Sequence, residues 1–63
     1  MCEATVVMIR GDKEEEIVKD AEIIDIDGSD LTISNILGRE TKVEGKIMKI
    51  DLLKNRIFVK ECS

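Results

Sequence analysis

Apolar and polar residues alternate along much of this 63-residue chain. Ile24 and Ile26 alternate with acidic residues, Leu31 and Ile33 with hydroxyl residues, and the apolar residues of 48–52 with Lys49 and Asp51. A period of two is typical of a strand with one buried face. Seven segments rich in β-branched residues are of strand length; they are 2–10, 15–19, 21–27, 31–37, 41–44, 46–53 and 56–61.

Turn-forming residues separate these segments. Gly11-Asp12 with the charged run 13–16 is typical of a hairpin tip, and the stretch 27–30, Asp-Gly-Ser-Asp, is typical of a tight turn. Further turns are expected at Leu37-Gly38, Gly45 and Lys54-Asn55. The pattern predicts an all-β fold, a small antiparallel β-barrel of about six or seven short strands, as a single domain over residues 1–63.

Some apolar residues fall on strand faces that the alternation assigns to solvent. These residues are Val7, Ile9, Ile23, Ile36, Ile47 and Phe58. A domain of this size buries only about 60% of the surface of its unfolded chain, so it is marginally stable alone. An apolar patch on its surface favours a partner, and we therefore expect a homodimer with several of these residues at the interface.

Charge and composition exclude several functions. The formal charge is −4, Phe58 is the single aromatic residue, and His is absent. Nucleic acid is therefore an unfavoured partner, although a basic patch formed by Arg39, Lys42, Lys46 and Lys49 is the alternative to a solvated strand face. Without His, and without a phosphate-binding glycine loop, the chain is not expected to be an enzyme. The segment 25–30 does not fit a calcium loop, because its first and twelfth positions would be Ile23 and Ser34.

The chain contains no apolar run long enough to span a bilayer and no signal-peptide pattern. We therefore expect a cytoplasmic protein without a membrane partner. In a reducing compartment, its two cysteines are expected to be thiols rather than a structural disulfide.

Cys2 directly follows the initiator methionine. We expect removal of Met1, because the second residue is small. Cys2 would then carry an α-amine and a thiol that together form a five-membered chelate ring around a metal ion. These groups have ordinary pKa values of about 8 and about 8.5, so metal binding would displace protons at neutral pH.

Thiolate sulfur and amine nitrogen, with the deprotonated backbone amide of Glu3 as a third donor, favour flat four-coordinate Ni(II) or Cu(II). Zinc prefers a tetrahedral set of Cys and His ligands, which this chain lacks. A two-fold dimer would supply an N and S pair from each copy. The alternatives are that Cys2 is merely a tolerated small residue, or that Cys62 forms a disulfide with it or adds a further ligand.

The opening Met1-Cys2-Glu3-Ala4-Thr5-Val6-Val7 resembles the start of the CooT family, small nickel-binding accessory proteins of carbon monoxide dehydrogenase maturation. The progression from Val18-Lys19-Asp20 to Ile23 and the stretch 45–52 followed by Ile57 extend the resemblance over nearly the whole chain. It implies a small β-barrel, a homodimer, Ni(II) bound through Cys2, and delivery or storage of nickel for the dehydrogenase. The partner would be that client metalloenzyme or another nickel accessory protein.

Two other functions remain as alternatives. The hydrogenase chaperone family HypC also begins Met-Cys and folds as a small barrel, but its members usually contain an early Pro-Gly and a His, both absent here. Proteins of the CooT family have also carried an RNA-binding label. The acidic charge and the single aromatic residue argue against RNA binding here. A small RNA-binding or protein-binding barrel with no metal role is the second alternative.

Overall fold

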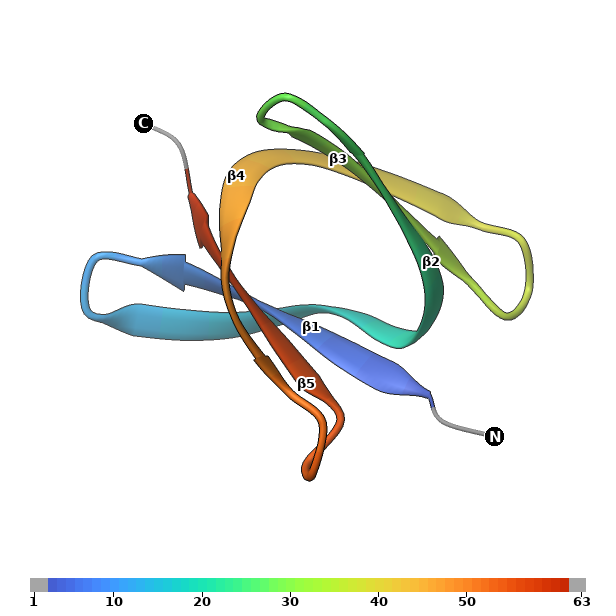
Figure 1. The fold of residues 1–63 in the computed structure, drawn as a ribbon, viewed down its shortest axis with the longest axis horizontal. Coiled ribbons are helices and arrows are strands. Elements are labelled where there is room, and N and C mark those ends of the chain that lie inside the picture. Colours follow the sequence, from blue (N-terminus) through green and yellow to red (C-terminus); the bar gives the residue numbers. More distant parts are fainter. Residues whose placement is uncertain (1–2, 62–63) are drawn as a thin grey trace.

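Five strands form a closed barrel in the computed structural model, which describes residues 3–61. In chain order they are β1 (Ala4–Arg10), β2 (Lys13–Asp27), β3 (Asp30–Asn35), β4 (Glu40–Asp51) and β5 (Arg56–Glu61) (Figure 1). Consecutive strands pair antiparallel, and β1 closes the barrel against β5 in parallel. The predicted all-β barrel is confirmed, with five strands in place of six or seven and with one parallel pair.

The strand count is lower than predicted because two long strands each pair with one neighbouring strand along their first part and with another along their second part. The expected segments 15–19 and 21–27 are one strand, β2, which pairs first with β1 and then with β3. Asp20 interrupts it with a φ of 59°, so the strand bends there instead of ending. Likewise, 41–44 and 46–53 merge into β4, which pairs with β3 and then with β5.

Gly45 marks the bend of β4 and is not a turn, contrary to the sequence prediction. A Cβ at this position would lie 2.6 Å from the Lys60 carbonyl oxygen and 2.7 Å from a Val59 methyl group. The Gly45 amide donates to the Ser29 carbonyl at 2.8 Å. A residue without a side chain is therefore required where β4 passes from one partner strand to the other. The predicted turns at Gly11, Gly28, Gly38 and Asn55 are confirmed, each with a positive φ.

The core is built from short branched side chains. Its buried members are Val6, Met8, Val18, Ala21, Leu31, Ile33 and Val59, and the partly buried Ile17, Ile24, Val43, Ile47 and Ile57 pack against them. Ile47 was predicted to face solvent. A register shift between Ile47 and Lys49 changes the alternation of β4, so that Ile47 packs inward while Met48 and Ile50 are more than half exposed.

Val7 was also predicted to be exposed to solvent, but its side chain is only 1% exposed. Its neighbours Val6 and Met8 face the core, so Val7 faces outward. It pairs with Glu16 on β2 and Phe58 on β5. The Glu16–Arg56 ion pair (3.3 Å) joins those two strands across β1. Neighbouring side chains thus cover this outward position.

Candidate metal-binding end of the barrel

The start of β1 lies at one end of the barrel, between two hairpin turns (Figure 1). Ala4 pairs with Ala21 beside the bend of β2. The Thr5 amide donates to the Asn55 carbonyl at 2.9 Å, which joins the β4–β5 turn to β1. The Ile36 amide donates to the Asp20 carbonyl at 3.2 Å, which joins the β3–β4 turn to the same bend. We call this region the N-terminal end.

Both turns at the N-terminal end expose leucine side chains to solvent. Leu37 of the β3–β4 turn is 80% exposed, and Leu52 and Leu53 of the β4–β5 turn are 81% and 93% exposed. Such side chains are usually buried. Their concentration on two turns that flank the beginning of β1 is typical of a contact surface.

Side-chain oxygens order these turns from within. Asn35 Oδ1 accepts from the amides of Leu37 (3.0 Å) and Arg39 (2.9 Å). Asp51 Oδ1 accepts from the amides of Leu53 and Lys54, both at 3.1 Å. These are turns of the type that Asn and Asp stabilise. The leucines are therefore presented on pre-ordered backbone, which lowers the entropy lost when a partner covers them.

Of the two predicted ligands, only Glu3 belongs to the described residues. Cys2 lies outside the described residues. Glu3, the tentative amide donor, is exposed and directly precedes Ala4. Within residues 3–61, no group of three or more His, Cys, Asp or Glu side chains is placed to hold a metal ion. The described barrel thus supplies a position for a terminal donor set and no competing side-chain site.

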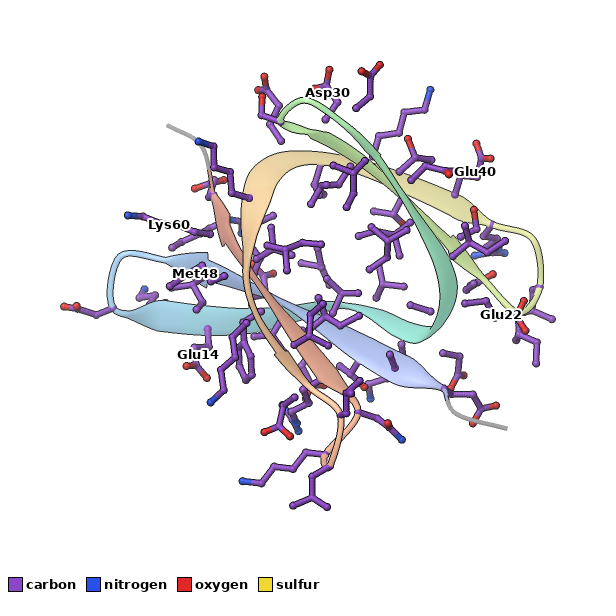
Figure 2. The ribbon with its side chains drawn as sticks, in the orientation of Figure 1. Glu14, Glu22, Asp30, Glu40, Met48 and Lys60 are labelled. Carbon is purple, nitrogen blue, oxygen red and sulfur yellow. The ribbon has the colours of Figure 1, made fainter. Side chains whose placement is uncertain are left out.

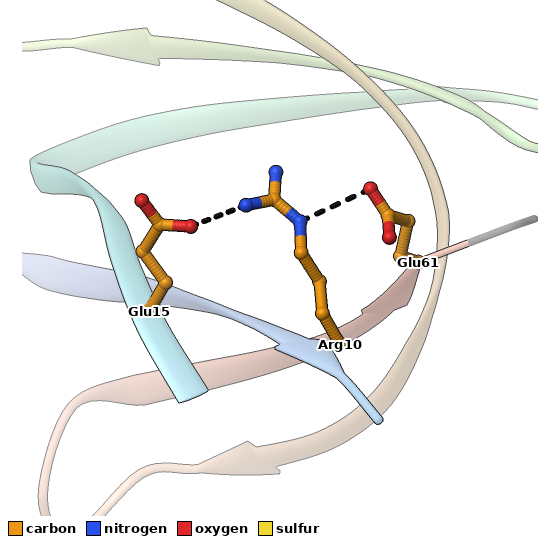
Figure 3. A network of polar contacts seen from close by, with 3 residues as sticks. All are labelled: Arg10, Glu15 and Glu61. Atoms are coloured by element: carbon orange, nitrogen blue, oxygen red, sulfur yellow. Dashed lines mark hydrogen bonds and ion pairs between the residues drawn. The ribbon is translucent and has the colours of Figure 1, made fainter. Parts of the chain in front are cut away.

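Cys62, also outside the described residues, follows a residue at the opposite end of the barrel. The parallel register of β1 and β5 places Thr5 beside Arg56 and Ile9 beside Lys60. Glu61 therefore lies beside the end of β1, where it accepts from Arg10 (Figure 3). Six residue steps along β1 lead from Ala4 to Arg10, about 20 Å of strand. The described neighbours of the two cysteines do not come together within one chain.

The six apolar residues assigned to solvent from the sequence do not form one patch. Val7, Ile9 and Phe58 belong to the outer face of β1 and β5. Ile23 and Ile36 are 55% and 46% exposed and lie near the N-terminal end, and Ile47 packs against the core. The sequence analysis did not identify Leu37, Leu52 and Leu53 as exposed surface residues. The two consecutive leucines next to the Lys54-Asn55 turn were the signal that could have indicated an apolar turn surface.

Comparison with known proteins identifies the family. A sequence model described as CO dehydrogenase accessory protein CooT matches residues 1–60. This chain belongs to the CooT family. The fold agrees: a crystal structure from Carboxydothermus hydrogenoformans, described as a candidate CooT, superposes with a TM-score of 0.89 at 27% identity, over 98% of this chain and 100% of the other. No curated protein matches the chain.

Membership of the CooT family confirms the predicted accessory role toward carbon monoxide dehydrogenase. The HypC-like alternative is not favoured, since the CooT match spans almost the whole sequence. Within residues 3–61, no helix is long and apolar enough to cross a membrane.

Proposed function

We propose that this CooT protein is a nickel metallochaperone that binds Ni(II) through Cys2 and assists its insertion into carbon monoxide dehydrogenase. The observation that carries the proposal is the placement of the start of β1 at an exposed end of a closed barrel. A terminal amine, a thiolate and the Glu3 amide there would project from a rigid scaffold. The accessory function of the family supplies the client.

The donor chemistry fits a cargo ion rather than a resident one. One terminus offers two or three donors, and a flat four-coordinate ion needs four. The described barrel offers no group of three or more ligand side chains. An incomplete set leaves positions open for donors of a second copy or of the client, as transfer requires. The protein acts as a carrier in the cytoplasm and is not itself a catalyst.

We propose in addition that the working form is a homodimer that pairs through the N-terminal end. Leu37, Leu52 and Leu53 supply the apolar surface, and pairing at this end would bring two chain starts together. Ile23 and Ile36, expected from the sequence to contribute to an interface, lie beside the same turns. One ion would then take an N and S pair from each copy, which gives about one Ni(II) per two chains.

Titration of the metal-free protein with Ni(II) tests the metal site. The wild type and Cys62→Ser are expected to develop a thiolate-to-nickel charge-transfer band that saturates near one ion per two chains. Cys2→Ser is expected to lose it. Intact-mass analysis should show that Met1 is absent, and a form that retains Met1 should bind poorly. Equal binding by Cys2→Ser would refute the proposed site.

A barrel that binds RNA or protein without a metal role is the competing function. It predicts RNA binding that weakens steeply with salt and does not change on Cys2→Ser.

A further inference from the structure

A shallow apolar recess lies on the outer face of the barrel, away from the N-terminal end. Its volume is about 190 Å³, and it is lined by Ile9, Met48 and Phe58, with Glu14 and Lys49 at its rim. The register explains the gathering: Ile9 pairs with Glu14 on β2, and Phe58 pairs with Lys49 on β4. Met48 is 56% exposed because it stands at the irregularity in β4.

One exposed lysine, Lys49, lines this recess, and two more, Lys46 and Lys60, lie beside it on the neighbouring strand positions. Lys46 and Lys60 lie directly opposite each other across β4 and β5, and Lys60 is also beside Ile9 on β1. The Lys49 ammonium stands 5.6 Å from the centre of the Phe58 ring. Figure 2 shows Lys60, Met48 and Glu14 on the same side of the barrel, with Glu22 and Glu40 on the other.

These lysines are among seven cations that form no ion pair within residues 3–61, the others being Lys13, Arg39, Lys42 and Lys54. Arg10, Lys19 and Arg56 each form an ion pair with a glutamate. Within residues 3–61, Lys46, Lys49 and Lys60 form none, although acidic residues outnumber basic ones by 14 to 10. Like charges directly opposite on a sheet destabilise it. The Lys46–Lys60 pair therefore does not stabilise the fold, which is typical of a surface kept for binding.

We propose that the recess and its three lysines bind an acidic segment of a partner protein that carries one apolar or aromatic anchor side chain. The anchor would enter between Met48 and Phe58, where the flexible thioether adapts to its shape. Carboxylates on either side of the anchor would neutralise the lysines. This pairing combines a central apolar contact with a charged rim, as protein interfaces do.

The observations favour a protein partner over nucleic acid. The chain has one aromatic residue for base stacking and a net charge of −4. The three cations of this surface are lysines, whereas arginine is the residue that binds phosphate through two hydrogen bonds at once. They also disfavour a second copy of the chain. The acidic residues near the β2–β3 turn of another copy would bind head to tail, and such contacts form rings or open filaments rather than a two-fold dimer.

An NMR titration of the metal-free, ¹⁵N-labelled protein tests the proposal. The probe is a nine-residue peptide of Asp and Glu with one central Phe. The amides of Ile9, Met48, Lys49 and Phe58 are expected to shift together. A peptide with Gly in place of Phe should bind at least fivefold more weakly.

Two charge reversals on the same strand provide the matched comparison. Lys46→Glu is expected to weaken peptide binding at least fivefold and to raise the unfolding temperature, since it converts the like-charge pair with Lys60 into an opposite pair. Lys42→Glu makes the same charge change beside Thr32 on β3, outside the recess, and should leave binding unchanged.

Equal weakening by both variants, or no localised shift at millimolar peptide, would overturn the proposal. Binding of an oligouridylate that is lost in Lys46→Glu would assign the surface to nucleic acid instead, and self-association sensitive to that variant would assign it to a second copy. None of these measurements depends on nickel, so they separate this docking site from the metal site.

Discussion

Arg10 and Glu61, the final residues of the parallel strands β1 and β5, are hydrogen-bonded to each other. The Arg10 Nε donates to a Glu61 carboxylate oxygen at 3.0 Å. The Arg10 guanidinium also pairs with Glu15 of β2 (Figure 3). One cation thus links β1, β2 and β5 at the end of the barrel opposite the start of the chain. The link holds the last described residues of the chain to a fixed strand.

Replacement of Arg10 by Ala should weaken this three-strand link only modestly. The partners are 40–59% exposed, and exposed ion pairs contribute about 0–1 kcal/mol each. We expect the unfolding temperature to fall by a few degrees and the difference to shrink in high salt. Lys13→Ala, at an exposed position without an ion pair in residues 3–61, is the control. A drop in unfolding temperature that does not change with salt would contradict the electrostatic origin.

Gly45→Ala should be far more damaging, because the new methyl group would meet the Lys60 carbonyl oxygen, a backbone atom that cannot rotate away. Overpacking of this kind costs about 1–3 kcal/mol. Urea unfolding measures the loss. Gly28→Asn is the control, since its site is open and Asn tolerates a positive φ. The requirement for glycine is refuted if both variants unfold at the same urea concentration.

Asp51→Ala should loosen the β4–β5 turn without unfolding the barrel. The carboxylate is the acceptor for the Leu53 and Lys54 amides, and its removal frees both. Hydrogen exchange of these two amides is expected to accelerate, while exchange in the Leu31 and Ile33 amides of β3 stays slow. Asp51→Asn, which retains the accepting oxygen, should exchange nearly as the wild type does. Acceleration throughout the barrel would mean that Asp51 stabilises the whole fold.

Leu52→Ser combined with Leu53→Ser should shift the protein toward the monomer. Burial of a leucine contributes about 1.5–3 kcal/mol, and a symmetric contact would lose it on both sides. Sedimentation velocity over a range of concentrations measures the change. Met48→Ser, which removes an exposed apolar residue elsewhere, is expected to leave the association unchanged. A double variant that dimerises as the wild type does would exclude the N-terminal end as the interface.

Local features of the sequence were sufficient for the strand segments and for four of the turns, but not for the way in which segments join into longer strands. Alternation identifies a half-buried strand because side chains point to opposite faces at every step. Gly11, Gly28, Gly38 and Asn55 identify turns because their backbones must adopt a positive φ. Cys2 and the Glu3 amide were chosen from covalent chemistry alone, and their role stays a prediction.

Only the tertiary structure decided how the strands join and what surrounds the beginning of the chain. β2 and β4 continue through bends at Asp20 and Gly45, where the sequence pattern predicted separate strands. The irregularity at Met48 changes which apolar residues of β4 are exposed to solvent. The parallel closure sets Thr5 beside Arg56, far apart in sequence, and so places Glu3 and Glu61 at opposite ends. The same closure brings the Leu52-Leu53 turn beside the start of β1, while the hydrogen bond from Ile36 to Asp20 holds the Leu37 turn there. Such pairings depend on contacts between distant segments, which a period of two cannot specify.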